Sequence, residues 1–251
     1  MEWRDKAVVL AGKAQGENHS LLTVFAREHG KVAALVYGGQ GRQKLPILQC
    51  GNGLDLAWRG KTPDALGHFD VELTEPRAAA AMSSRLSLEL LTMIAELLLH
   101  VLPEGEGHEG LFDATSVLLD QSGDKTIFAV LLPRWEIGLL SALGAGLTLD
   151  RCVATGEMLE DGAELCFVSP KSGGAVSYKA GLPYKEKLFP LPPFLIGMGE
   201  PTEEDVAAAL RLTGHFVEER LLLPLGREMP ASRQGLASRL GLPQGRHGFA
   251  R

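Results

Sequence analysis

The chain has 251 residues, of which 45% are hydrophobic and 22% are charged, as in ordinary soluble globular proteins with room for two modest domains. This composition excludes a chain that is mostly disordered, and three cysteines do not make a disulfide framework. A net charge of -6, taken for the chain as a whole, argues against nucleic-acid binding.

The N-terminus and the most apolar segment argue against export and membrane insertion. Acidic residues stand in the first ten positions, where a signal peptide needs a basic start and a long apolar run. The segment 86–102 contains Glu89, Glu96 and His100, whose charges the centre of a bilayer would oppose. We therefore expect a cytosolic, reduced protein with a buried helix over 86–102 and no contact with a membrane.

Five strand-like runs fill the front of the chain. They cover residues 6–12, 19–27, 32–37, 53–60 and 67–76, and turn residues such as Gln15-Gly16 and Gly51-Asn52-Gly53 separate them. Five short strands suit a small closed barrel better than a sandwich, which needs seven or more. The sequence thus predicts an OB-fold barrel over residues 1–77.

Positive charge is concentrated on this predicted barrel. Six cations lie between residues 27 and 61 against Glu28 and Asp55, a local charge of +4 that leaves -10 for the rest of the chain. A hairpin with its turn at His29-Gly30 leads into the Gly-rich loop 38–44, where two cations can neutralise phosphates. The predicted DNA-binding residues are Arg27, Lys31, Tyr37, Arg42, Lys44, Arg59 and Lys61. A plain solvated loop remains the alternative for 38–44, and Tyr37 and Trp58, which could stack on bases, could equally belong to the core.

From Glu75-Pro76 onward the pattern becomes helical, and we place a domain boundary there, with a helical domain over 78–251. Helices are expected at 83–102, after Ser83 or Ser84 as N-cap, at 109–121, at 125–143 and from Thr202 to about 222. Pro133 should kink or split the third of them. A turn-rich insertion is expected at 150–180, and residues 189–197 should return in extended form.

The tail from Gly226 is basic. It contains five arginines against the single acid Glu228, and a solvated tail is favoured over a second DNA contact. The arginines are Arg227, Arg233, Arg239, Arg246 and Arg251.

Catalytic and metal-binding patterns are incomplete. The chain lacks a phosphate-binding loop of the G-x-x-x-x-G-K-[ST] type, and Glu219 stands where a zinc signature starting at His215 needs a second histidine. Cys152 and Cys166 do not form paired C-x-x-C knuckles. We expect no enzyme activity, no cofactor and no metal.

Several short motifs in a fixed order resemble the RecO family of bacterial recombination mediators. They are Trp3-Arg4-Asp5 before Val8-Val9-Leu10, Gly38-Gly39 before the basic loop, Arg134-Trp135-Glu136 before Leu143-Gly144, and Ser169-Pro170 before Gly173-Gly174. The resemblance covers nearly the whole chain. It implies an N-terminal OB-fold, a helical domain and a zinc-ribbon-like insertion, and a cytoplasmic, nucleoid-associated protein of DNA repair.

The resemblance also implies a function without covalent chemistry. Members would bind single- and double-stranded DNA, anneal complementary strands and, with RecR, help to load RecA onto DNA covered by single-stranded DNA-binding protein. Arg134 would hold the acidic, apolar C-terminal tail of that protein; bracing of the helix packing is the alternative. In zinc-bearing members the insertion has four thiolates, and Thr155, Ser177 and Ala180 replace three of them here.

Two other function classes remain open. In the first, the acidic helical body is a protein-binding adaptor and the barrel is scaffold, so that DNA affinity is negligible. In the second, the chain is a hydrolase that uses its histidine and glutamate residues.

Overall fold

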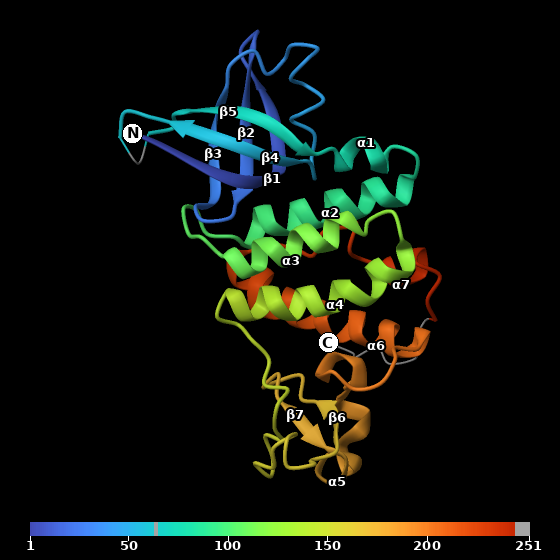
Figure 1. Cartoon of the computed structure of the whole chain (residues 1–251). Coiled ribbons are helices and arrows are strands. Elements are labelled where there is room, and N and C mark those ends of the chain that lie inside the picture. Colours follow the sequence, from blue (N-terminus) through green and yellow to red (C-terminus); the bar gives the residue numbers. More distant parts are fainter. Residues whose placement is uncertain (63–64, 244–251) are drawn as a thin grey trace. The chain divides into compact units, whose positions relative to one another are not determined.

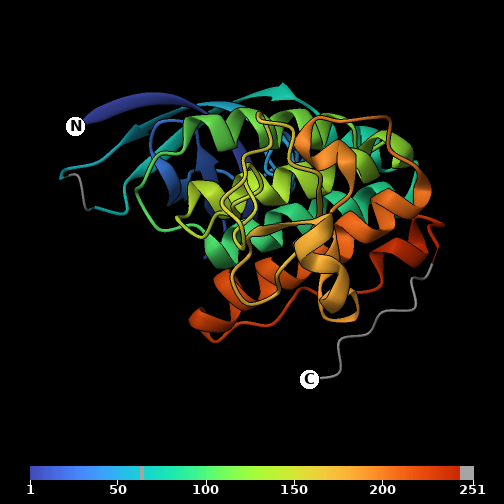
Figure 2. The same cartoon turned by 90° about the horizontal axis from the view of Figure 1, so that it is seen from below.

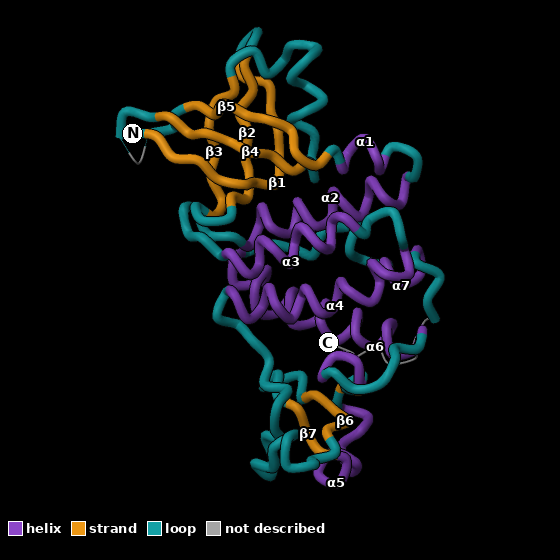
Figure 3. The backbone as a smooth tube through the Cα atoms, viewed as in Figure 1, coloured by secondary structure: helices purple, strands orange, loops and turns teal. Residues whose placement is uncertain are grey.

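The computed structural model describes residues 1–62 and 65–243, shown in two views in Figures 1 and 2 and by secondary structure in Figure 3. The chain forms two compact units. The first comprises Met1–Lys125 with Pro230–Gln234, and the second comprises Thr126–Met229 with the described residues from Gly235 onward. Each unit is described by itself below.

Five strands at the N-terminus form a closed barrel in the order β1-β2-β3-β5-β4. They are β1 (Glu2–Gln15), β2 (His19–Ala26), β3 (Gly30–Val36), β4 (Gly53–Arg59) and β5 (His68–Glu75). The long β1 serves both neighbours, because its first half pairs with β4 and its second half with β2. Strands β3 and β5 pair in parallel through a single residue pair, Leu35 with His68. The five predicted strands are confirmed, and the barrel is consistent with an OB-fold.

The barrel core follows from the alternation of side chains along each strand. Residues at every second position point inward and are buried, which is the period that a pleated strand imposes. Trp58 is one of these core residues, only 3% exposed, and its ring stacks on that of Trp3. Tyr37, directly after β3, is 51% exposed. The structure therefore assigns Trp58 to the core and leaves Tyr37 on the surface.

Three helices complete the first unit. They are α1 (Arg77–Ala81), α2 (Arg85–Val101) and α3 (Glu109–Asp120), and the Ser84 hydroxyl caps α2 by accepting the Ser87 N–H. The change from strand to helix lies near Glu75, as the sequence indicates. The division between the two compact units lies after Lys125, so the first unit contains the barrel together with α1, α2 and α3. The reason is packing: α2 contacts β1, and the Phe25 ring of β2 meets the Phe112 ring of α3 edge to face.

The second unit combines helices with a small sheet. Its longer helices are α4 (Lys125–Ala142) and α6 (Glu203–Val217), and the Thr202 hydroxyl and Asp205 carboxylate form the predicted capping box of α6. The sheet has the order β7-β6-β8, made of β7 (Ala175–Ser177), β6 (Leu165–Val168) and β8 (Phe189–Pro190). Short helical segments complete it: α5 (Tyr178–Gly181), η1 (Leu182–Lys187), η2 (Pro193–Ile196), the π-helical η3 (Glu218–Leu222), η4 (Leu223–Leu225) and α7 (Leu236–Arg239).

Three sequence-based expectations need correction. Pro133 does not split α4, because the helix continues through it; Pro133 is buried with Leu132 and Trp135, and packing of this face holds the helix together across the missing N–H. Residues 189–197 are not extended throughout, because Pro193 opens the turn η2 and Gly197 closes it at φ 76°.

The third correction concerns the basic tail. Arg233 is 7% exposed, and Leu236 and Leu240, one helical turn apart, are buried, so the tail is folded over its described part. Arg246 and Arg251 lie outside the described residues. Of the helices that the structure describes, none combines the length and the apolar character needed to cross a membrane.

Candidate nucleic-acid interface

Arg27 is engaged with acids of α3. Its guanidinium donates from Nε to Asp113 Oδ1 at 2.9 Å, from Nη2 to Asp113 Oδ2 at 3.0 Å, and from Nη1 to Glu109. The hydrogen bond from Arg27 lowers the pKa of the Asp113 carboxyl. The two acids lie in the first half of α3, where negative charge also suits the helix dipole. Arg27 therefore fixes α3 to the barrel.

Lys31 makes the corresponding contact with α2. Its Nζ donates to the carbonyl oxygen of Leu99 at 3.2 Å, in the last turn of α2, where orphan carbonyls accept cations. Arg59, on β4, is also paired, because its Nη1 donates to Asp70 at 2.6 Å and its Nη2 to Glu2 at 3.2 Å. Arg27 and Arg59 are thus paired with acids, and Lys31 with the end of a helix, within the first unit.

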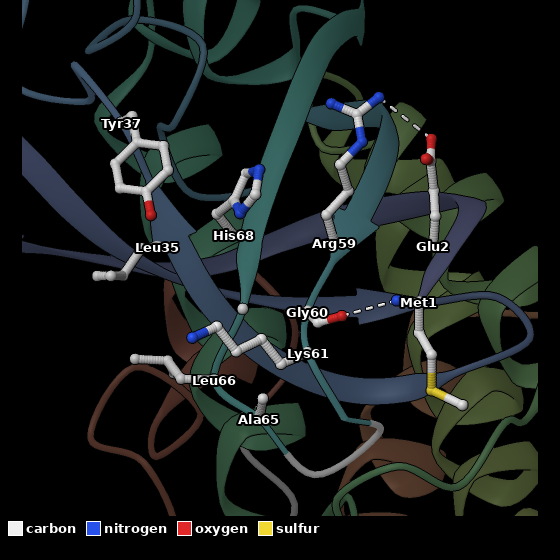
Figure 4. Close-up of a pocket in the computed structure, with 11 residues that line it drawn as sticks. Met1, Glu2, Leu35, Tyr37, Arg59, Gly60, Lys61, Ala65, Leu66 and His68 are labelled. Atoms are coloured by element: carbon white, nitrogen blue, oxygen red, sulfur yellow. Dashed lines mark hydrogen bonds and ion pairs between the residues drawn. The ribbon is translucent and has the colours of Figure 1, made fainter.

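Of the other four predicted residues, Tyr37 and Lys61 line an open hollow, and Arg42 and Lys44 lie in the loop that follows Tyr37. The hollow has a volume of about 810 Å³, and Tyr37 and Leu35 line it together with His68, Lys61 and Leu66. Figure 4 shows these side chains around the hollow, with the first two residues of the chain and Arg59 on its other side. Among the described residues, no acid forms an ion pair with Arg42, Lys44 or Lys61.

Tyr37 stands between two histidines. Its ring centroid lies 5.0 Å from that of His19 and 5.0 Å from that of His68, so the three rings form one aromatic group at the surface. The tyrosine is pre-positioned, since the Lys44 Nζ donates to its carbonyl oxygen at 2.9 Å. An exposed ring held in place beside cations can stack on a base at a low entropic cost.

The Gly-rich loop after β3 is ordered by local hydrogen bonds. The Gln40 side chain donates from Nε2 to the Ser20 hydroxyl at 2.6 Å, and the Gly41 N–H donates to the Gly38 carbonyl at 2.9 Å. Gly39 is required for this approach, because a Cβ there would stand 2.7 Å from the Ser20 side chain. The loop therefore presents Arg42 and Lys44 from a fixed backbone.

Arg134, the predicted partner-binding residue, is exposed on α4. Its Nη2 donates to the Phe194 carbonyl oxygen at 3.1 Å, and the guanidinium lies 5.3 Å from the centre of the Phe194 ring. Met198, which follows the same turn, is 52% exposed. Arg134 thus braces η2, as the alternative in the sequence analysis states, and its role in partner binding stays a prediction.

The insertion is organised around the sulfur of Cys152. This side chain is fully buried, its Sγ accepts the Ser177 N–H at 3.2 Å, and the Ser177 hydroxyl oxygen lies within hydrogen-bond distance of it at 3.5 Å. Burial by itself raises the pKa of the Cys152 thiol, but hydrogen bonds from Ser177 and Thr155 outweigh it and lower the pKa to about 6.

These neighbours do not fit a zinc ion. Zinc in structural sites takes four thiolate or imidazole ligands, whereas hydroxyl and backbone groups surround this single thiol. The part of the chain that the structure describes contains no group of three or more His, Cys, Asp or Glu side chains that could hold a metal ion. Hydrogen bonds to the sulfur connect the two parts of the insertion that a metal would otherwise join.

Sequence reasoning missed two residues that organise these surfaces. Asp5 on β1 accepts hydrogen bonds from the N–H groups of Glu28 and His29 and from the His29 ring, and thus fixes the corner between β2 and β3. Arg220, in the π-helical η3, donates to the carbonyls of Ala145, Gly146 and Ser172 and lies over the Phe216 ring. Asp5 belongs to the motif Trp3-Arg4-Asp5, but the motif does not indicate its contacts, and Arg220 has no distinctive local motif, so only the folded chain reveals both roles.

Comparison with known proteins gives the class. Residues 1–77 match the family model "Recombination protein O N terminal", and residues 83–228 match "Recombination protein O C terminal". Curated proteins named DNA repair protein RecO are similar over most of their length. The protein of Rhodospirillum centenum is 40% identical over 95% of this chain and 94% of its own, and that of Hyphomonas neptunium is 42% identical over 97% and 100%.

These matches place the chain among proteins of DNA repair and recombination. It belongs to the RecO family.

Proposed function

We propose that this chain binds single- and double-stranded DNA without sequence preference, through the barrel surface around Tyr37, Arg42, Lys44 and Lys61. The single observation that carries the proposal is the exposed Tyr37 ring, held between two histidines at the edge of a hollow that also contains Lys61. Cations neutralise phosphates and release counterions, and an exposed aromatic ring stacks on any base. Arg27 and Arg59 are left out of this interface because acids pair with them, and Lys31 because it binds the last turn of α2; the contact of Lys44 with the Tyr37 carbonyl lies within the interface itself.

The rest of the activity follows from holding strands close together. A protein that neutralises two DNA strands with their bases free promotes annealing and needs no covalent chemistry, so we propose a mediator rather than an enzyme. We further propose that the protein acts in the cytoplasm with RecR to help load RecA onto DNA covered by single-stranded DNA-binding protein. Family membership supports these partners.

Binding of a labelled single-stranded oligonucleotide across a salt series tests the interface. The wild-type affinity should fall steeply with salt. Arg42→Ala/Lys44→Ala/Lys61→Ala should weaken binding and lower the salt slope by about 0.7 for each phosphate that the protein no longer neutralises. Tyr37→Ala should cost roughly 5-fold or more, since stacking of one base contributes about 1–3 kcal/mol.

The control for this experiment is Arg4→Ala/Lys6→Ala. These cations are exposed on the same barrel but line a different hollow, which contains Asp5, Glu28, Asp55 and Glu72. Wild-type affinity in the control and reduced affinity in the triple variant support the proposal. Failure of the wild-type chain to retain the oligonucleotide at low salt would instead favour a protein-binding adaptor.

Arg134 is proposed as the contact for the acidic, apolar C-terminal tail of the single-stranded DNA-binding protein. A peptide of that tail should bind the wild-type chain, and Arg134→Ala and Met198→Ser should each weaken binding, the first about 10-fold or more because a charge-assisted hydrogen bond is removed. Lys171→Ala, which removes an exposed cation from the same unit, is the matched control. Equal peptide affinity in all four proteins would leave Arg134 with only its contact to Phe194.

A further inference from the structure

The tyrosines are distributed unlike the other aromatic residues. The chain contains three, and all are exposed: Tyr37 by 51%, Tyr178 by 43% and Tyr184 by 61%. By contrast, Trp58, Trp135 and most of the described phenylalanines are buried. A large aromatic ring that stays exposed gives up the stabilising free energy that its burial would provide. The exposure of all three tyrosines therefore suggests that they share a role at the surface.

Two of the three tyrosines lie in one short segment of the second unit, which we name the α5–η1 patch. Figure 1 shows α5 beside the strands β6 and β7. Leu182, between the two tyrosines, is also exposed, by 45%. The patch consists of the exposed residues Tyr178, Lys179, Leu182, Tyr184, Lys185 and Lys187.

The backbone beneath the patch is fixed. The Tyr178 N–H donates to the Glu164 carbonyl at 2.8 Å, and the Leu188 N–H donates to the Lys185 carbonyl at 3.3 Å. Gly181 packs so closely that an added Cβ would stand 2.4 Å from the Phe167 ring. The exposed side chains therefore project from an anchored segment rather than from a loose loop.

The charge of the patch is positive. Three lysines stand against one acid, Glu186, which lies at the outer limit of an ion pair with Lys185, 4.0 Å from its Nζ. No acid of the described chain forms an ion pair with Lys179 or Lys187. This excess lies on a chain whose overall charge is -6, so the patch is a local attractor for anions.

We infer that the α5–η1 patch is a second contact surface for single-stranded nucleic acid. Its two rings stack on bases, and its lysines neutralise the phosphates between them, the combination by which sequence-blind proteins track a single strand. The inference rests on the proposed DNA-binding function and extends it. With one surface on the barrel and another on the insertion, a single molecule has a contact for each of two strands, which annealing requires.

Photo-cross-linking of the full chain to a bromodeoxyuridine-substituted oligonucleotide, followed by peptide mapping, tests the contact directly. Cross-links should appear both at Tyr37 and within residues 178–187. The annealing rate of two complementary oligonucleotides is the functional measurement. Tyr178→Ala/Tyr184→Ala should lower this rate roughly 10-fold or more, in line with the loss of two stacked bases, and leave the affinity for one strand within about 2-fold.

Three further variants separate chemistry from stability. Tyr178→Phe/Tyr184→Phe keeps the rings and should anneal like the wild type. Lys179→Ala/Lys185→Ala/Lys187→Ala should anneal slowly, whereas Arg151→Ala/Lys171→Ala/Arg227→Ala, which removes three exposed cations from the same unit, should not. Equal thermal stability of the variants confirms that the insertion remains folded.

The outcomes distinguish this inference from the proposed function. A wild-type chain that binds no oligonucleotide overturns both. A chain that binds through Tyr37, with no cross-link in 178–187 and normal annealing by the patch variants, overturns the α5–η1 patch alone.

Discussion

At the scale of single residues, the sulfur of Cys152 shows how the insertion is held together. One sulfur accepts the backbone N–H of Ser177 and is hydrogen-bonded with its hydroxyl group, which brings the turn after Cys152 against the end of β7. A buried donor that loses such a partner costs about 1–3 kcal/mol. Cys152 therefore contributes to stability through hydrogen bonds that depend on its protonation state.

This dependence gives a prediction for the pH profile. The folded thiol has a pKa of about 6 and the unfolded thiol its ordinary value of 9.0, so unfolding takes up a proton between these pH values. The stabilisation is complete above pH 9 and is lost as the pH falls through 6. Thermal melts of wild type and Cys152→Ala from pH 5 to 9.5 should show a difference in Tm that grows with pH. A difference that stays constant over this range would contradict the thiolate.

Cys166 provides the internal control for that experiment. Burial raises the pKa of the Cys166 thiol above its ordinary value of 9.0, and Glu164 adds to the effect, so this thiol is neutral in the folded and the unfolded chain well below pH 9. Cys166→Ala should shift the Tm by an amount that does not change between pH 5 and 8.

At the scale of elements, the connection between β2 and β3 depends on a close approach of two backbones. Gly30 has φ 67°, and a Cβ there would stand 2.0 Å from the Glu106 carbonyl oxygen. Gly16, in the β1–β2 turn, has nearly the same φ of 65° but nothing within 4 Å. The two positions share the backbone conformation and differ in their surroundings.

Alanine substitution at both positions should separate these two effects. Gly16→Ala should destabilise the protein by about 1–2 kcal/mol, the cost of a left-handed conformation. Gly30→Ala should cost clearly more, since the segment 103–108 must move as well. Urea unfolding of both variants measures the free energy of unfolding. An equal decrease in both would show that the segment around Glu106 moves away from residue 30 at no cost.

The elements were largely predictable, whereas the roles of the cations were not. Alternation along the strands and the caps at Ser84 and Thr202 are local signals, and each predicts the element that the structure contains. The partners of Arg27 and Lys31 lie more than 60 residues away on α3 and α2. A count of charges along the chain cannot tell a cation that binds another element from one that faces solvent.

At the candidate site, the same limit applies to the aromatic residues. Tyr37 and Trp58 both occupy strand-like runs, and only the direction of each side chain decides between core and surface. The structure places Trp58 inside and Tyr37 outside. The two histidines beside Tyr37 come from different strands, so no sequence spacing could have indicated their contact.

At the scale of the whole molecule, the barrel is not a separate compact unit. Phe25 of β2 is fully buried and meets Phe112 of α3, while Arg27 and Lys31 bind the helices directly. Removal of α2 and α3 would expose Phe25, and exposure of one such side chain costs about 1.5–3 kcal/mol. The strand-to-helix change near residue 77 is therefore a poor place to cut the chain.

Two truncated chains test this view. A fragment of residues 1–125 should melt cooperatively in differential scanning calorimetry, and a fragment of residues 1–77 should melt at a lower temperature or show no transition. The substitution Phe25→Ala should lower the Tm of the longer fragment more than that of the shorter one. Equal stability of both fragments would mean that the helices add nothing to the barrel.

The seam between β3 and β5 has fewer paired residues than any other strand pairing in the barrel. A single residue pair, Leu35 with His68, closes the cylinder there, supported by one hydrogen bond from the Leu35 N–H to the Gly67 carbonyl. Leu35 and His68 also line the hollow beside Tyr37, so an occupant of that hollow would touch both edges of the seam. A ligand in the hollow would then bridge β3 and β5 and stabilise their pairing. Because this strand pairing has the fewest residue pairs in the barrel, its stability should respond most strongly to binding.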